Sequence, residues 1–220
     1  MKRKMLKIFA ASMVMGLVSS SALAGHKSEG TYSITLTNLT RGTLFTPAVA
    51  ITHASGIKSF EVGEAASAEI GMLAEGGATQ PLQDAIYATG KAFDAANSGP
   101  VFPGKSVTIT VQTKDDAEYI TLGSMMLPTN DGFIALNGVK GPKEGKTRVF
   151  YLRAYDAGTE TNDELCANIP GPHCGGVPFS DGQAEGYVHI HAGIHGIGDL
   201  NAADYDWRNP VAKVTVVRMK

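Results

Sequence analysis

The stretch Ser106-Val-Thr-Ile-Thr-Val-Gln-Thr113 alternates apolar and polar side chains along its length, and its apolar members are β-branched. Alternation with a period of two is typical of a strand that buries one face and exposes the other. The turn-forming pair Pro103 and Gly104 stands just before it. The stretch therefore predicts a β-strand packed on one side of a core, as is common in antiparallel sheets.

Other segments of the chain have the same strand-like character and are separated by clusters of Gly, Pro, Asn and Asp. They are residues 32–40, 45–53, 119–127, 133–139, 148–155, 187–194 and 212–219. Residues 79–93 differ, because Leu82, Ala85 and Ile86 recur at helical spacing, and a weaker helical pattern covers 64–70. Since strands and helices do not alternate regularly, we expect an all-β fold. The prediction is an antiparallel β-sandwich of about eight strands with a short helical connection.

The N-terminus has the pattern of an export signal. Four basic residues lie among the first seven, an apolar run covers residues 8–18, and Ala22-Leu23-Ala24 resembles a cleavage site. The apolar run is shorter than the roughly 20 residues of a membrane-spanning helix. We therefore expect a signal peptide at 1–24, a flexible start at 25–29 and one domain at 30–220. The mature chain is expected to be periplasmic or secreted, without a transmembrane segment.

The net charge of the chain limits the kinds of partner that it is expected to bind. The full chain has 19 Lys and Arg against 21 Asp and Glu, and the predicted signal contains four of the basic residues and none of the acidic ones. The mature chain would thus have 15 basic and 21 acidic residues, a net charge of −6. Nucleic acids and anionic membranes attract basic surfaces, so this balance argues against both as partners.

The two cysteines of the chain, Cys166 and Cys174, flank Pro170-Gly171-Pro172. In an exported protein, two cysteines at this spacing predict one disulfide that closes a short loop. The alternative is a metal site with two thiolate ligands.

Acidic residues gather where two predicted strands meet their loops. Asp156-Ala-Gly-Thr-Glu160 ends one apolar segment, and Asp131 follows the turn Pro128-Thr-Asn130. Calcium requires several oxygen ligands from a chain that bends sharply, and carboxylates from two neighbouring loops supply them. Residues 162–164 add further oxygen donors. The alternative is ordinary turn chemistry, because Asp often caps backbone N–H groups at strand ends.

His189 and His191 form a second candidate site, with His195 close behind. Two residues apart in a strand, their side chains point to one face, where a pair of imidazoles can bind zinc or copper. A surface pair, or histidines bonded to a neighbouring strand, would look the same in sequence. The chain has no His-Glu-x-x-His and no Gly-x-Ser-x-Gly motif, so we expect a protein that is not an enzyme. The alternative is a transition-metal-binding protein or a metal-dependent enzyme that uses His189 and His191.

The segment Asp131-Gly-Phe-Ile-Ala-Leu-Asn-Gly-Val139, followed by Tyr-Asp-Ala-Gly-Thr-Glu at 155–160, resembles the spondin N-terminal domain. That family is an extracellular β-sandwich of animal matrix proteins and exported bacterial proteins. The resemblance extends over residues 30–220. It implies a calcium ion held by Asp131, Asp156 and Glu160, and a binding or adhesion role toward an extracellular or envelope protein or glycan.

Two positions depart from the animal pattern of this family. Gly132 stands where that pattern has tryptophan, and Glu160 replaces its last aspartate. The longer Glu160 side chain is compatible with the flexible coordination of calcium.

Overall fold

The computed structural model describes residues 29–180 and 183–219. The predicted signal peptide and residues 25–28 of the predicted flexible start lie outside these ranges. The first strand already begins at Glu29, so the last residue of the predicted flexible start belongs to the sheet.

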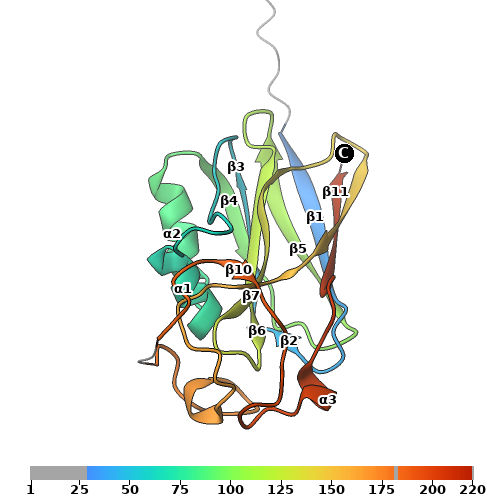
Figure 1. The fold of residues 1–220 in the computed structure, drawn as a ribbon. Coiled ribbons are helices and arrows are strands. Elements are labelled where there is room, and N and C mark those ends of the chain that lie inside the picture. Colours follow the sequence, from blue (N-terminus) through green and yellow to red (C-terminus); the bar gives the residue numbers. More distant parts are fainter. Residues whose placement is uncertain (1–28, 181–182, 220) are drawn as a thin grey trace, which may run out of the picture.

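The described residues form an antiparallel sandwich of two sheets (Figure 1), which confirms the predicted fold class. The smaller sheet has four strands in the order β5 (Ser106–Lys114), β1 (Glu29–Asn38), β11 (Ala212–Met219) and β8 (Thr147–Leu152). The larger sheet has the order β10 (His189–Ile190), β9 (Ala154–Asp156), β7 (Gly132–Lys140), β6 (Tyr119–Leu127), β3 (Val49–His53) and β4 (Ala92–Asn97). The short strand β2 (Leu44–Phe45) pairs with β6.

The main core lies between the two sheets and follows from strand alternation. Ile34 of β1 is opposite Val216 of β11 on one side and Ile109 of β5 on the other. All three side chains are buried and pack with Leu122 and Met125 of β6. The residues that alternate with these along β1, β5 and β11 point away from the core, as a period of two requires.

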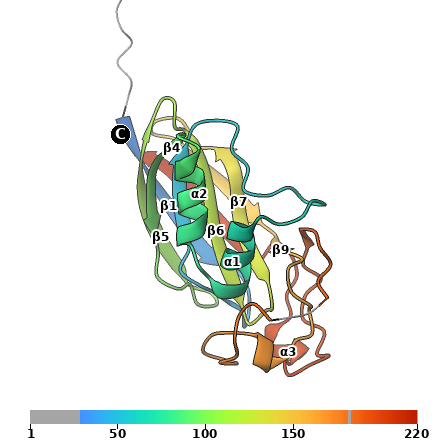
Figure 2. The ribbon, with the colours of Figure 1, turned by 90° about the vertical axis from the view of Figure 1, so that its left-hand side faces the viewer.

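Two helices cover the outer face of the larger sheet, and Figure 2 shows both lying over its strands. They are α1 (Ala68–Gly76) and α2 (Gln80–Ala88). Leu73 and Leu82 of these helices pack so closely on β6 that a Cβ at Gly123 would lie 2.7 Å from Leu73 Cδ2. The helices create a second core, and for that reason β6 is buried on both faces.

Three sequence expectations need correction. The predicted strand 148–155 is interrupted at Arg153, and its two halves belong to different sheets as β8 and β9. The predicted strand 187–194 reduces to the two residues of β10. The helical segment 79–93 ends at Ala88, because Gly90 (φ +69°) turns the chain into β4, a strand whose Ala-rich sequence has no alternating pattern.

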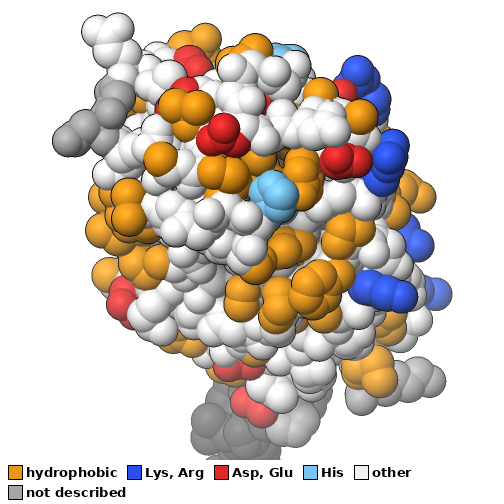
Figure 3. All heavy atoms as spheres, turned by 90° about the horizontal axis from the view of Figure 1, so that it is seen from below, with side chains coloured by type: hydrophobic (Ala, Val, Ile, Leu, Met, Phe, Trp, Pro, Cys, Tyr) orange, Lys and Arg blue, Asp and Glu red, His pale blue; other side chains and the backbone are white. Residues whose placement is uncertain are grey.

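Loops with two short helical segments, η1 (Cys166–Asn168) and α3 (Ala202–Tyr205), form the lower end of the molecule. The disulfide Cys166–Cys174 is present there as predicted, so the alternative of two thiolate metal ligands is wrong. Seen from below, hydrophobic side chains gather on this end (Figure 3). None of the helices in the described ranges combines the length and apolar character needed to cross a membrane.

Candidate functional site

Asp156 is the last residue of β9 and lies between two neighbouring strands. Its register partner on β7 is Gly132, and its partner on β10 is His189. Asp156 is fully buried. The sheet therefore places Asp156 directly beside Gly132, the residue after Asp131, and beside His189, the first of the two candidate histidines.

The turn after Asp156 depends on glycine. Gly158 has φ +65°, and a Cβ there would lie 2.3 Å from the carbonyl oxygen of Tyr187. The N–H of Gly186 donates to the carbonyl of Gly158 over 2.9 Å. This close contact of two backbones brings the segment that contains His189 against the Asp-Ala-Gly-Thr-Glu turn.

Asp131, the residue before β7, supports the same turn. Its Oδ2 accepts hydrogen bonds from the N–H groups of Thr159 (2.8 Å) and Glu160 (3.1 Å). Its Oδ1 is buried and has no hydrogen-bond partner. One oxygen of this carboxylate thus has a structural role, and the other remains available to a ligand.

Glu160 is also buried, with 1% of its surface exposed. Its Oε1 accepts a hydrogen bond from the N–H of Ser180, and its Oε2 is buried without a partner. Glu75 of α1 lies close enough to interact with it, and burial raises the pKa of Glu75 as well. No sequence pattern selects Glu75, because the contact arises only when α1 packs on the sheet.

Burial raises the pKa of these carboxyl groups. It raises the pKa of Asp156 to about 7, and the charge of Asp131 adds to the effect. Burial also raises the pKa of Glu160 to about 7, with contributions from Glu75 and Asp131, and it raises the pKa of Asp131. No lysine or arginine within the described ranges forms an ion pair with these four carboxylates. Such a cluster is suited to a metal cation, which would supply the missing positive charge.

The three predicted calcium ligands, Asp131, Asp156 and Glu160, are neighbours, but their oxygens do not converge on one point. Among the described residues, Asp156 shares a group of ligand atoms within 4.8 Å of one another with Glu185 and His189, not with Asp131 and Glu160. Calcium–oxygen distances are about 2.3–2.6 Å. One ion in contact with Asp131, Asp156 and Glu160 therefore requires movement of their side chains.

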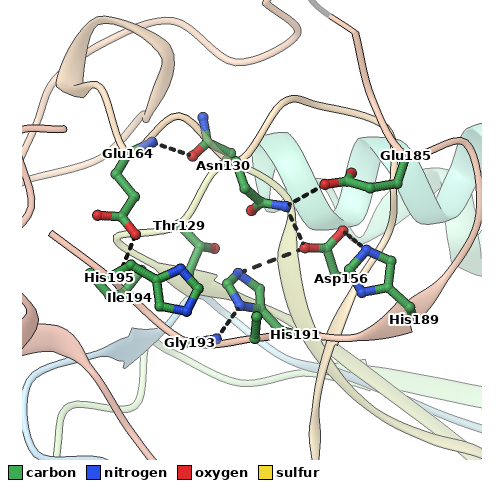
Figure 4. A pocket seen from close by; sticks show the side chains of 12 residues that line it. Thr129, Asn130, Asp156, Glu164, Glu185, His189, His191, Gly193, Ile194 and His195 are labelled. Carbon is green, nitrogen blue, oxygen red and sulfur yellow. Dashed lines mark hydrogen bonds and ion pairs between the residues drawn. The ribbon is translucent and has the colours of Figure 1, made fainter. Parts of the chain in front are cut away.

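His189 and His191 both reach the carboxylate of Asp156, which lies between them in Figure 4. Nε2 of His189 is 3.4 Å from Asp156 Oδ1, and Nε2 of His191 is 4.0 Å from Oδ2. The His191 ring is buried against Trp207, with ring centres 5.0 Å apart, and burial lowers the pKa of His191 to about 4, with His189 and His195 contributing. His191 lies just beyond β10, so the expectation that both imidazoles point to one side of a strand stays a prediction, although both rings approach Asp156.

The space beside Gly132 explains why His191 fits there. A Cβ at position 132 would lie 2.6 Å from Thr129 Oγ1 and 3.0 Å from His191 Cδ2. Any larger side chain at position 132 would compete with His191 for this space. The chain thus departs from the animal pattern at Gly132, and His191 lies there beside Asp156.

The remaining polar residues of the loops have structural roles. Glu164 is buried and accepts hydrogen bonds from three successive backbone N–H groups, at positions 195–197. Asp199 accepts a hydrogen bond from Cys166 N (2.8 Å), and Asp206 accepts one from Ile194 N (3.2 Å). The amide of Asn162 donates to Asp156 Oδ2 (2.7 Å) and Glu185 Oε1 (3.2 Å).

Glu185 was missed by sequence reasoning. It lies in a loop far along the chain from Asp156, and no motif or periodicity distinguishes it from other acidic residues. It joins the site because the backbone contact between positions 158 and 186–187 folds its loop back onto β9.

A family model described as Spondin_N matches residues 23–165. The match includes Asp131, Asp156 and Glu160, and it ends before the disulfide loop, Glu185 and the histidine segment. Comparison with curated proteins gave no match.

Proposed function

The chain belongs to the Spondin_N family of extracellular domains, and on that premise we propose that it is an exported calcium-binding module with a binding or adhesion role and no catalytic activity. The disulfide Cys166–Cys174 is compatible with an oxidising compartment outside the cytoplasm. The proposed calcium ligands are Asp131, Asp156 and Glu160, with Glu75 beside them.

The observation that carries this proposal is a pair of buried oxygens without partners. Within residues 29–180 and 183–219, Asp131 Oδ1 and Glu160 Oε2 have no hydrogen-bond partner, although each belongs to a fully or almost fully buried residue. Leaving an acceptor of this kind unsatisfied is costly, and it is more costly when the group is charged. A bound calcium ion would supply the positive charge and oxygen coordination that these carboxylates lack.

The loops around the site support a role in contact rather than catalysis. Between residues 160 and 200 they expose large apolar side chains, including Leu165, Val177, Phe179 and Ile197. Hydrophobic side chains also gather on the lower end of the molecule (Figure 3). Exposed apolar groups favour a protein or glycan partner, and calcium would hold the turn at 156–160 from which these loops start.

A thermal melt of the mature chain in EDTA, with calcium then added back, tests the proposal. An ion that binds only the folded state adds about 2.7 kcal/mol at a hundredfold excess over its dissociation constant. For a domain of about 200 residues this corresponds to a rise in Tm of about 5–10 °C. Asp131→Asn and Glu160→Gln should each lose most of the rise.

Glu144→Gln is the matched control, because Glu144 is exposed in the loop between β7 and β8. This variant should respond to calcium as the unmodified chain does. The proposal is wrong if calcium leaves the Tm of the unmodified chain unchanged, or if Asp131→Asn retains the full response.

A further inference from the structure

A mixed nitrogen and oxygen donor set lies on the opposite side of Asp156 from Asp131. Ligand atoms of Asp156, Glu185 and His189 lie within 4.8 Å of one another and line a pocket of about 190 Å³ (Figure 4). Zinc binds imidazole nitrogen and carboxylate oxygen at about 2.0–2.2 Å, so two ligands of one ion are at most about 4.4 Å apart. Small side-chain movements bring the three groups to that spacing.

His189 has the tautomer that a metal ligand needs. Its Nδ1 lies 3.1 Å from the carbonyl oxygen of Ile190, which can only accept, so Nδ1 donates the hydrogen. In the neutral ring, Nε2 then has a free lone pair. That atom is buried, has no hydrogen-bond partner and faces Asp156 Oδ1. A histidine that donates one ring N–H to a carbonyl and directs the other nitrogen at a carboxylate cluster is typical of metal ligation.

His191 has the opposite tautomer. Its Nδ1 accepts a hydrogen bond from the N–H of Gly193 over 3.0 Å, so in the neutral ring the hydrogen is on Nε2. Only 3% of the side chain is exposed, and Nε2 is buried without a partner, directed at Asp156 Oδ2. An N–H group cannot ligate a metal, but it can donate to a carboxylate that does. The two histidines therefore have different roles, although the sequence pattern treats them as a pair.

We propose that Asp156, Glu185 and His189 bind a first-row divalent transition metal, with zinc as the probe, and that His191 orients Asp156 through its Nε2–H. Imidazole together with carboxylates favours zinc and its neighbours, whereas calcium prefers oxygen ligands alone. Three protein ligands leave one position of a tetrahedral ion open toward the pocket. Water or an oxygen atom of a partner completes the coordination there.

This site differs from the proposed calcium site in two of its three ligands. The two share only Asp156, and Asp131 and Glu160 are not members of the group that contains His189. Variants of Glu185 and His189 therefore test the transition metal alone, and variants of Asp131 and Glu160 test calcium alone.

Calorimetric titration of zinc into the untagged mature chain, in saturating calcium, tests the proposal. We expect one zinc ion per chain. His189→Ala and Glu185→Gln should weaken binding by more than about 100-fold, as loss of a ligand does. His191→Gln should keep the stoichiometry and weaken binding about 10- to 100-fold, the usual effect of removing a group that orients a ligand.

His195→Ala is the matched control, because His195 lines the same pocket but is exposed and belongs to neither metal group. Its zinc affinity should equal that of the unmodified chain, as should that of Asp131→Asn. Cobalt, used as a visible substitute for zinc, should show an absorption band that disappears in His189→Ala and persists in His191→Gln. Circular dichroism establishes that each variant is folded.

Two results would overturn this assignment. If the unmodified chain binds no zinc, His189 is a charged partner of Asp156 and nothing more. If His189→Ala binds zinc as the unmodified chain does, the ligands lie elsewhere on the surface.

Discussion

Asp156 and His189 face each other across the antiparallel strands β9 and β10, and Asp156 Oδ1 lies 3.4 Å from Nε2 of His189. Asp156 belongs to the part of the chain matched by the Spondin_N model, and His189 lies beyond it. The same carboxylate therefore connects the buried acids of the family motif with a histidine segment outside the match. Substitution at position 156 should affect both proposed metals.

Asp156→Asn should remove the stabilisation by calcium and the binding of zinc together. Without metal, this variant should melt at a higher temperature than the unmodified chain at pH 8, because the substitution removes a buried charge that is unfavourable there. Thermal melts in EDTA, calcium and zinc measure all three effects. A full calcium response in this variant would remove Asp156 from the proposed ligands.

Without metal, the free energy of unfolding should fall as pH rises from about 4.5 to 7. The folded pKa values of Asp156 and Glu160 are about 7, well above their ordinary values of 3.8 and 4.5. The folded chain therefore binds two protons in this range that the unfolded chain has released, so raising the pH favours unfolding. His191 opposes this below pH 6.5, because burial lowers its pKa to about 4, but it accounts for one proton only.

Urea denaturation in EDTA at several pH values measures this dependence. The fall should be smaller in Asp156→Asn, which lacks one of the two carboxyls. Calcium should reverse the trend, because metal ligands must be deprotonated and binding then releases protons. A stability in EDTA that rises steadily from pH 5 to 7 would contradict the assigned pKa shifts.

Glu164→Gln should destabilise the fold without affecting calcium. The Glu164 carboxylate accepts three backbone N–H groups from positions 195–197, and an amide offers only one acceptor oxygen. These bonds are part-buried, and hydrogen bonds to a charged group contribute about 1.5–3 kcal/mol each. The free energy of unfolding should fall by this amount, while the calcium-induced rise in Tm persists. Loss of that rise would instead make Glu164 part of the calcium site.

Gly158→Ala should lower the free energy of unfolding by more than about 1 kcal/mol and weaken both metal responses. Alanine is strained at φ +65°, and its Cβ would lie 2.3 Å from the carbonyl oxygen of Tyr187. The turn must then separate from the segment that contains Glu185 and His189. Gly90→Ala is a suitable control, since Gly90 has φ +69° but no atom within 4 Å of the added Cβ. A Gly158→Ala variant no less stable than Gly90→Ala would contradict the close contact.

The strands that sequence predicts well are those that bury one face. β1, β5 and β11 have alternating side chains, and their observed bounds agree with the predicted ones within a few residues. β4 lacks this signal, because its Ala-rich sequence does not alternate, and its pairing with β3 is visible only in the fold. The change of sheet at Arg153 is also invisible in sequence, since both halves of that segment look like one strand.

The residues of the candidate site also divide into those that the local sequence identifies and those that only the fold brings together. The local sequence identifies Asp131, Asp156 and Glu160, because glycine and acidic residues at strand ends mark a turn with oxygen donors. It cannot reveal that Glu75 and Glu185 join them, since those contacts form between elements distant along the chain.

The sequence by itself determined the β-sandwich class, the disulfide and the acidic turn, because periodicity, cysteine spacing and turn chemistry are local properties. Only the tertiary structure decided which carboxylates are buried without compensating charge. It also distinguished His189 from His191, since a hydrogen bond to one ring nitrogen determines which atom of the imidazole retains a lone pair. Burial and hydrogen-bond partners arise from packing between distant segments, and no pattern within one segment encodes them.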